Sequence, residues 1–515
     1  MSDASKSLIF GTILRNFLST FENDLSSLTD AIVSSSSIVF GTIIKELLPT
    51  PAKTHYTFNL RDLAKVFQGM LMVEPKRIAS KEQLARLWVH ESRRVFGDRL
   101  TCEEDRDWLD KLLKQQIECN FSLKYEDVVT SKRLVYCNFV AGADSTTYEE
   151  VTNMEALKRV VEDALADYNA ESKSQMPLVI FNDALEHVAR ISRVLRQLQG
   201  NALLLGVGGS GRQSMTRLAN YLAGYDLKTV EIMKGYSMTD WREDIKKVLM
   251  QAGVKDRPTT FLFSDVQIVN ERMVEDINNI LNAGDVPNLY LPEDFEAITS
   301  ACRVECQKRK IPPTKINIFQ QYLNRVRKNI HLCIAMSPLG DAFRNRLRNY
   351  PSLVNCCTID WFTNWPAEAL QSVGVSIIQK NALDLSDYES GAVQMFKEIH
   401  LSVEHASKDY FDMLRRHNYV TPTSYLELLS SFSKLIHTKR LEISTKVNRL
   451  QSGLDKLAET KGVVGSMQEE LKILQPQLVK TQEEVASMME VIKKVSLTEK
   501  KRFFCIINLP FSGQG

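Results

Sequence analysis

The chain has 515 residues, of which 44% are apolar and 25% charged, and this composition is typical of a globular protein with several domains. Its formal net charge of +2 gives no bulk attraction to nucleic acid or to an anionic membrane, and no apolar run approaches the roughly 20 residues of a membrane-spanning helix, so neither partner is expected. The nine cysteines form no paired framework and no zinc-ligand pattern, which favours a reducing cytoplasm.

Residues 1–120 are predicted to be mostly helical, because apolar residues recur there at helical spacing. One helix is expected near the N-terminus and another near Lys81–Arg99, with a serine-rich patch at Ser34–Ser37 and the Pro49–Pro51 segment as interruptions. No phosphate-binding loop precedes these helices. They therefore look like a helical subdomain whose catalytic half lies outside this chain.

Residues 121–170 are polar and less periodic, and they are interpreted as a connector with one strand within Arg133–Val140. From residue 171 to 365, short apolar runs of strand length alternate with helical spacers. Such alternation predicts an α/β fold, with a parallel sheet flanked by helices. The runs are Pro177–Phe181, Ala202–Leu205, Thr260–Phe263 and Ile330–Met336.

A glycine-rich loop follows the second of these runs and opens an amphipathic helix, which is the strand–loop–helix context of a P-loop. The usual ending is Gly-Lys-Ser/Thr, but here arginine replaces the lysine and glutamine replaces the hydroxyl residue, with a serine one place later. We expect the loop to bind ATP or ADP; the alternative is a glycine-rich turn without a ligand. The loop residues are Gly206, Val207, Gly208, Gly209, Ser210, Gly211, Arg212, Gln213 and Ser214.

An aspartate, Asp265, ends the strand that begins at Thr260, as in the Walker B strand of P-loop proteins. Asp265 is the candidate Mg²⁺ ligand, with Ser214 as a weak second one. AAA+ proteins that hydrolyse nucleotide carry a glutamate directly after this aspartate. Here that residue is Val266, which cannot act as a general base.

The strand ending at Met336 is followed by Ser337, where AAA+ proteins place a polar sensor that contacts nucleotide. Three arginines come next, at positions 344, 346 and 348. Arg346 and Arg348 are candidate arginine fingers for the nucleotide of a neighbouring module. The alternative is a solvated basic face.

Residues 366–440 are predicted to be helical, and residues 441–497 to form a coiled-coil strand, because apolar side chains recur every seven residues. At 1.5 Å per residue this helix would extend roughly 75–80 Å. Pro476 is expected to kink or break it, and residues 498–515 depart from the heptad pattern. The strong seam consists of Ile443, Leu450, Leu457, Val464, Leu471, Leu478, Val485 and Ile492.

Several long motifs in this order resemble the fourth AAA+ module of dynein heavy chains, and the Arg212–Gln213 ending is most similar to the axonemal members. The motifs are Pro177–Ile191, Gly206–Ser214, Lys234–Tyr236, Trp241–Asp244, Arg325–Asn329, Met336–Pro338 and Thr358–Pro366.

The resemblance extends to both ends of the chain. Leu47–Asp62 is similar to the lid of the third module, with Arg61 at the place of the lid arginine, and the heptads resemble the outgoing strand of the stalk. The fourth module's own lid lacks a clear sensor arginine in the turn Tyr419–Tyr425.

The resemblance implies a fragment of a microtubule motor that works in the cytoplasm, the cytoskeleton and the axoneme of cilia. Its partners would be the remaining AAA+ modules, the returning stalk helix, other dynein chains and, through the stalk, microtubules. We expect the complete module to bind nucleotide structurally or as a regulator, with little hydrolysis. The alternatives are a self-sufficient AAA+ ATPase of the remodelling class and a coiled-coil interaction protein with a vestigial loop.

Overall fold

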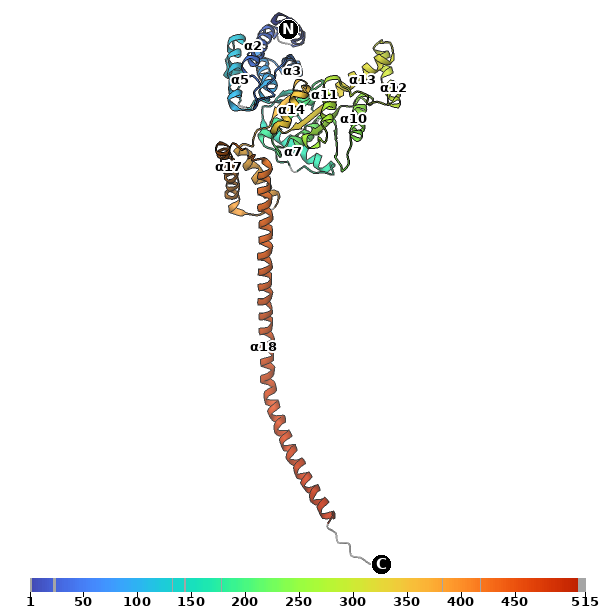
Figure 1. Ribbon diagram of the computed structural model, residues 1–515. Helices are drawn as coiled ribbons and strands as arrows, with labels where there is room; N and C mark the ends of the chain where they lie inside the picture. The colour runs from blue at the N-terminus through green and yellow to red at the C-terminus, as the bar shows by residue number, and fades with distance from the viewer. Residues whose placement is uncertain are drawn as a thin grey trace, which may run out of the picture. The chain divides into compact units, whose positions relative to one another are not determined.

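The computed structural model describes residues 2–21, 25–131, 133–142, 145–176, 178–381, 383–416 and 418–507 (Figure 1). The chain divides into two compact units, residues 1–430 and 431–515. Of the tail that departs from the heptad pattern, residues 508–515 lie outside the described part.

The elements of the chain, in order, are α1 (Asp3–Leu18), η1 (Ser26–Leu28), α2 (Thr29–Glu46), α3 (Leu60–Met70), η2 (Pro75–Arg77), α4 (Lys81–Ser92), η3 (Arg93–Gly97), α5 (Glu103–Gln116), η4 (Ile117–Phe121), α6 (Tyr125–Val128), β1 (Tyr136–Cys137), β2 (Glu149–Glu150), α7 (Met154–Glu171), α8 (Asn182–Arg196), β3 (Ala202–Leu205), α9 (Arg212–Ala223), β4 (Asp226–Thr229), α10 (Met238–Gly253), β5 (Thr259–Ser264), η5 (Asp265–Gln267), α11 (Glu271–Ala283), α12 (Pro292–Lys308), α13 (Lys315–Asn329), β6 (Ile330–Met336), α14 (Gly340–Asn349), α15 (Ser352–Asn355), β7 (Thr358–Trp361), α16 (Ala367–Lys380), η6 (Ser386–Tyr388), α17 (Glu389–Leu414) and α18 (Pro422–Ile507).

The N-terminal helices, α1 to η4, enclose their own apolar core. Trp88 of α4 is fully buried in it, and its indole N–H donates to Ser36 Oγ at 2.8 Å. Ser34–Ser37 was expected to interrupt the helical pattern, but the whole patch lies inside α2. Buried serines are tolerated there because Ser36 also donates to the carbonyl of Ile32 one turn earlier.

One helical stretch of the described residues, Ser26–Glu46, is long and apolar enough to cross a membrane by length and composition alone. It contains the whole of α2, whose Ile32, Val39 and Ile43 have no exposed surface. These side chains pack against the other N-terminal helices, as in the core helix of a folded domain.

A parallel sheet of five strands, in the order β4-β5-β6-β3-β7, forms the centre of the α/β region. Every residue of β3, β5 and β6 is buried, because helices cover both faces of the sheet. The predicted fold class is confirmed. The strand expected at 177–181 is wrong: residues 178–181 form no strand, and Pro177 lies outside the described residues. Within Arg133–Val140 only Tyr136–Cys137 is a strand, paired antiparallel with β2.

Helices α16, α17 and the first turns of α18 follow the sheet. Tyr425 anchors this group: it is fully buried, and its hydroxyl donates to the carbonyl of Leu370 in α16 at 2.8 Å. The start of α18 is thereby attached to α16.

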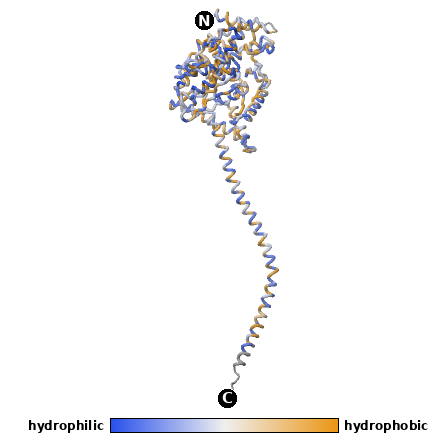
Figure 2. The backbone as a smooth tube through the Cα atoms, turned by 90° about the vertical axis from the view of Figure 1, so that its right-hand side faces the viewer, coloured by the Kyte–Doolittle hydropathy of each residue, from blue (hydrophilic) through white to orange (hydrophobic). Residues whose placement is uncertain are grey.

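In the second unit, α18 continues to Ile507 with Pro476 inside it, so of the expected kink or break the break does not occur, while the far part of the helix curves (Figure 1). The proline removes one backbone hydrogen bond, and the bonds on either side maintain the helix. Figure 2 shows hydrophobic and hydrophilic residues alternating along α18. The heptad side chains are exposed within the described residues; Leu471 and Leu478 each keep about three fifths of their surface, 60% and 61%.

Candidate functional site

The phosphate-binding loop connects β3 to α9 at the carboxyl edge of the sheet. Gly209 has φ +77° and Gly211, the N-cap of α9, has φ +87°. Residues other than glycine rarely adopt this left-handed backbone conformation, so both turns of the loop depend on glycine. The loop presents the N-terminus of α9, as a phosphate site requires.

Arg212 does not extend freely from the loop. Its guanidinium donates to the backbone carbonyl of Met336, at the end of β6, and to that of Val207 at 3.2 Å. Burial lowers the pKa of Arg212, while the nearby Asp265 carboxylate acts in the opposite direction. The arginine thus joins the loop to β6, where a P-loop lysine would reach toward phosphate.

Three polar residues of the loop differ in their surroundings. Ser210 is buried, and its hydroxyl has no hydrogen-bond partner among the described residues. Gln213 is exposed and Ser214 half-buried. The described side chains form no group of three or more His, Cys, Asp or Glu residues suited to a metal. A metal here would depend on Asp265, the nucleotide and water.

Asp265 and Ser337, which lie 72 residues apart in the sequence, are joined in the structure. The backbone N–H of Ser337 donates to Asp265 Oδ2 at 2.8 Å, so the contact uses the main chain of Ser337 rather than its hydroxyl. It ties the end of β5 to the end of β6. Val266 follows Asp265 and is 87% exposed. An aliphatic side chain in solvent thus occupies the position at which hydrolysing AAA+ proteins have the catalytic glutamate.

One contact of the loop was not predicted from the sequence. A methyl group in place of a Gly209 hydrogen would collide with Thr423 Oγ1 and would lie 2.8 Å from the Thr423 nitrogen. Thr423 belongs to the first turn of α18, so the lid helix begins directly against the loop. The sequence around Thr423 shows only a Pro-Thr-Ser start of a helix, and it gives no sign of a contact with a loop more than 200 residues earlier.

The two candidate arginine fingers lie on α14 in different environments. Arg346 forms a double hydrogen bond with Glu271 of α11, at 2.8 and 3.1 Å to Oε1. Arg348 instead lines a pocket of about 530 Å³, together with Arg344 and residues 49–57 of the N-terminal helical region. Arg61 lies at the start of α3, where its guanidinium donates to Cys356 Sγ at 3.0 Å.

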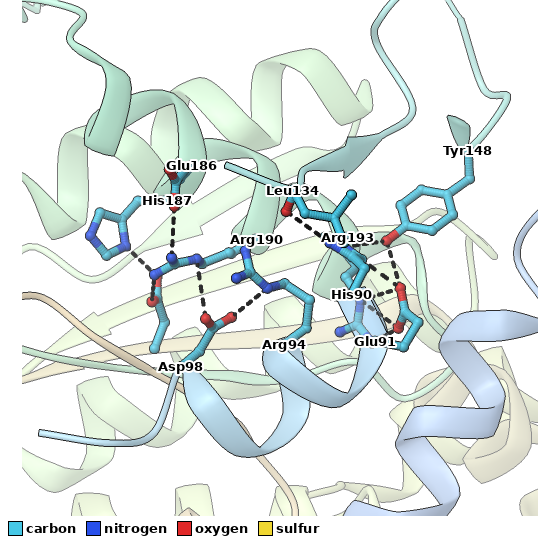
Figure 3. Close-up of polar contacts among 11 residues, drawn as sticks. His90, Glu91, Arg94, Asp98, Leu134, Tyr148, Glu186, His187, Arg190 and Arg193 are labelled. Atoms are coloured by element: carbon cyan, nitrogen blue, oxygen red, sulfur yellow. Dashed lines mark hydrogen bonds and ion pairs between the residues drawn. The ribbon is translucent and has the colours of Figure 1, made fainter. Parts of the chain in front are cut away.

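A buried network of charges joins the N-terminal helices to α8 and β7 (Figure 3). Glu91 of α4 pairs with Arg193 of α8 and accepts a hydrogen bond from the Tyr148 hydroxyl at 2.7 Å. Both members of the Glu91–Arg193 pair are almost fully buried. Arg190, Arg193 and Arg196 recur at helical spacing, which predicts an outward-facing basic side of the helix; for Arg193, which is buried, that prediction is wrong.

A second part of the network is built around Asp98 and Asp360. Asp98 lies 3.2 Å from Arg94 and 3.4 Å from Arg190, and Arg190 also binds Asp360 at 3.0 Å. Burial raises the pKa of Asp98. Burial acts the same way on Asp360, but His187 and Arg190 outweigh it and hold the pKa of Asp360 at about 2. These charges are compensated within the interface, which fastens the N-terminal helices to the sheet.

Residues 176–435 match the family model described as the P-loop containing dynein motor region D4, and residues 32–131 match that of the AAA+ lid domain. The chain is 48% identical over 508 residues to dynein axonemal heavy chain 1 of Mus musculus, a match that covers 96% of this chain and 12% of that protein. It is 40% identical over 494 residues to dynein axonemal heavy chain 6 of Homo sapiens, a match that covers 95% of this chain and 12% of that protein.

Another relative is the dynein-1-beta heavy chain of the flagellar inner arm I1 complex of Chlamydomonas reinhardtii. It is 41% identical over 464 residues, covering 89% of this chain and 10% of that protein. The chain therefore spans about a tenth of the length of these relatives.

Proposed function

This chain belongs to the dynein heavy-chain family, and we propose that its complete AAA+ module binds ATP or ADP at Gly206–Ser214 and holds it with little hydrolysis. The module would consist of a large subdomain, residues 171–365, and a helical lid, residues 366–440. Nucleotide between them would brace the two parts. Its role in the motor is then structural or regulatory.

The observation that carries this proposal is that the loop has the backbone geometry for binding phosphate, while the side chains that would catalyse hydrolysis are replaced or engaged elsewhere. Gly209 and Gly211 keep the left-handed turns and α9 offers its N-terminus, so the phosphate cradle is intact. The residue after Asp265 is an exposed valine, and the charge of Arg212 is used on two carbonyls. A site of this kind favours retention of nucleotide over attack by water. Asp265 remains the candidate Mg²⁺ ligand, with Ser214 as the weaker one and Ser337 as the sensor.

Residues 1–120 would act as the lid of the preceding module, with residues 121–170 as a connector. Arg348 then fits the arginine finger for that module's nucleotide better than Arg346, because Arg346 is paired with Glu271 and Arg348 lines the pocket beside residues 49–57. Arg61 would approach the same nucleotide from the lid side. The buried Glu91–Arg193 pair supports this role, since it fastens the lid to the following sheet.

Residues 441–497 would pair their heptad seam with the returning helix of the stalk, through which the whole motor reaches microtubules. Further partners would be the other modules of the ring and other dynein chains. The proposed location is the axoneme of cilia, as part of the cytoskeleton, after synthesis in the cytoplasm. The names of the axonemal and flagellar relatives support this assignment.

Equilibrium binding and turnover of ATP by the 515-residue chain test the proposal. We expect ATP and ADP to bind with micromolar or better affinity and ATP to persist over many minutes. Turnover at the rates of ordinary ATPases would support instead a self-sufficient AAA+ ATPase, for which the strand–loop–helix geometry around Gly206–Ser214 is the favouring observation. A lack of binding to either nucleotide would favour the interaction protein with a vestigial loop.

A further inference from the structure

Helices α12 and α13 form a hairpin that projects from the α/β region (Figure 1). α13 packs on α10, where Tyr322 and Val326 have no exposed surface, and α12 packs on α13. A groove of about 940 Å³ remains open along α12, and its lining positions on this helix recur every three or four residues from Pro292 to Gln307. At 1.5 Å per residue the groove follows one helical face for roughly 22 Å, the length of about four helical turns.

The floor of the groove is apolar and open to solvent at two places. Phe295 keeps 45% of its surface exposed and Val304 keeps 55%. Phe295 is held there by Tyr290 and Phe319, with ring centroids 6.0 and 5.7 Å away, and the buried Ile298 closes the floor beneath it. Because these groups line a groove rather than a convex edge, they fit the apolar face of a helix better than the surface of a bilayer.

Cations surround the half of the groove that lies toward the turn of the hairpin. Arg303 and Lys315 line it, and Lys308 and Lys310 follow at the end of α12. Within the part of the chain that the structure describes, none of these four side chains forms an ion pair. One carboxylate, that of Glu296, lies among the lining residues near the start of α12. The excess of positive charge complements an acidic partner and repels a basic one.

We propose that this groove docks an acidic amphipathic helix of a partner protein, with apolar side chains on Phe295 and Val304 and carboxylates beside Arg303 and Lys315. In this mode of recognition, anchors at positions i, i+3, i+4 and i+7 of the incoming helix follow the length of the groove. None of the residues that line the groove belongs to the phosphate-binding loop, so the docking is separate from nucleotide binding.

Two labelled synthetic peptides of about 16 residues, matched to the length of the groove, test the proposal. Both carry leucine at the i, i+3, i+4 and i+7 positions; one has glutamate at the flanking positions and the other has lysine. The full chain carries Leu471→Glu/Leu478→Glu throughout, so that the heptad seam does not compete for the peptides. By fluorescence anisotropy, the acidic peptide should bind about tenfold more tightly than the basic one, because like charges at the rim of the groove repel.

Substitutions in the hairpin assign the binding to the groove. Val304→Glu should weaken binding of the acidic peptide about tenfold, as the loss of an apolar anchor does. Ile316→Glu is the matched control, because Ile316 is 81% exposed on the same hairpin but does not line the groove, and its affinity should stay within about twofold. Arg303→Glu should weaken binding of the acidic peptide and strengthen binding of the basic one, a gain that an unfolded hairpin would not give.

Three results with the peptides would overturn the proposal: no binding of the acidic peptide, equal binding of both peptides, or equal affinities in Val304→Glu and Ile316→Glu. Two other occupants are tested with the same variants. Binding to vesicles of phosphatidylserine and phosphatidylcholine, or concentration-dependent association of the chain, would also overturn the proposal if Val304→Glu abolished it. The groove would then take a membrane or a second copy of the chain.

Discussion

The backbone N–H of Ser337 donates to the carboxylate of Asp265 at 2.8 Å, which ties together the ends of the neighbouring strands β5 and β6 on one side of the phosphate-binding loop. In a P-loop ATPase the equivalent aspartate is committed to the metal and its water shell. Here the carboxylate already serves a structural bond and lies near the positive charge of Arg212.

A weak dependence on Mg²⁺ follows from this arrangement. Chelation with EDTA should reduce the affinity of the chain for ATP less than about tenfold, because Gln213 offers only a neutral carbonyl and the N–H of Ser337 occupies one carboxylate oxygen of Asp265, which weakens this candidate ligand. Gln213→Thr returns a hydroxyl to the standard position and should increase the dependence, as measured by titration with and without Mg²⁺. A wild-type affinity that collapses on chelation would show that the module depends strongly on Mg²⁺ and would contradict this prediction.

Replacing the exposed valine after Asp265 should not create an ATPase. In Val266→Glu the general base returns, but Gln213 and the engaged Arg212 still leave the metal and the phosphates poorly placed. Turnover measured by phosphate release should stay within about twofold of the wild type, because general-base catalysis requires a correctly positioned water. Brisk hydrolysis by this single variant would contradict our interpretation of the loop; Val269→Glu, at another exposed valine nearby, is the control.

The Glu91–Arg193 pair should be essential for the attachment of the N-terminal helices. Glu91→Ala leaves a buried guanidinium without its partner, which typically costs about 3–5 kcal/mol. Native-state hydrogen exchange of α4 and α8 should show that loss. The exposed Lys472–Glu469 pair in α18 provides the comparison, since breaking it should leave exchange in α4 unchanged. Unaltered protection of α4 in Glu91→Ala would mean that apolar packing alone holds the interface.

Mild acid should loosen the same region through His55. Burial lowers the pKa of His55 to about 4, and the ring stacks on Trp361 with centroids 5.0 Å apart. The unfolded chain therefore binds a proton more readily, so the stability is complete above about pH 6.5 and is lost as the pH falls toward 4. One proton corresponds to a change of up to about tenfold in the unfolding equilibrium per pH unit. His55→Phe should flatten the profile measured by urea denaturation between pH 7 and 4.5; an unchanged slope would exclude His55 as its source.

The exposed heptad seam should cause self-association. The chain should form oligomers in sedimentation velocity at micromolar concentration, because Leu471 and Leu478 bury little surface within the described residues. The double variant Leu471→Glu/Leu478→Glu should be monomeric and should bind nucleotide as the wild type does. A monodisperse wild-type monomer with a protease-resistant α18 would contradict this prediction.

Local chemistry was sufficient to predict much of this molecule. The strand, glycine loop and helix around Gly206–Ser214 lie within one short segment, and the heptads repeat along one helix, so both follow from spacing alone. The expectations that failed were also local ones. Residues 178–181 are apolar but pair with no strand, and the serine-rich patch Ser34–Ser37 lies inside a helix that it was expected to interrupt.

The contacts that define the candidate site join residues far apart in the chain, and only the tertiary structure decided them. Arg212 reaches Met336 across 124 residues, Ser337 reaches Asp265 across 72, and Arg193 reaches Glu91 across 102. The sequence by itself determined which residue types are available: Arg212 stands where a P-loop has lysine, Val266 stands where hydrolysing AAA+ proteins have glutamate, and Thr423 stands at a helix start. Their partners depend on the order of strands in the sheet and on the packing of the lid, because a side chain's hydrogen bonds are set by what folding brings beside it.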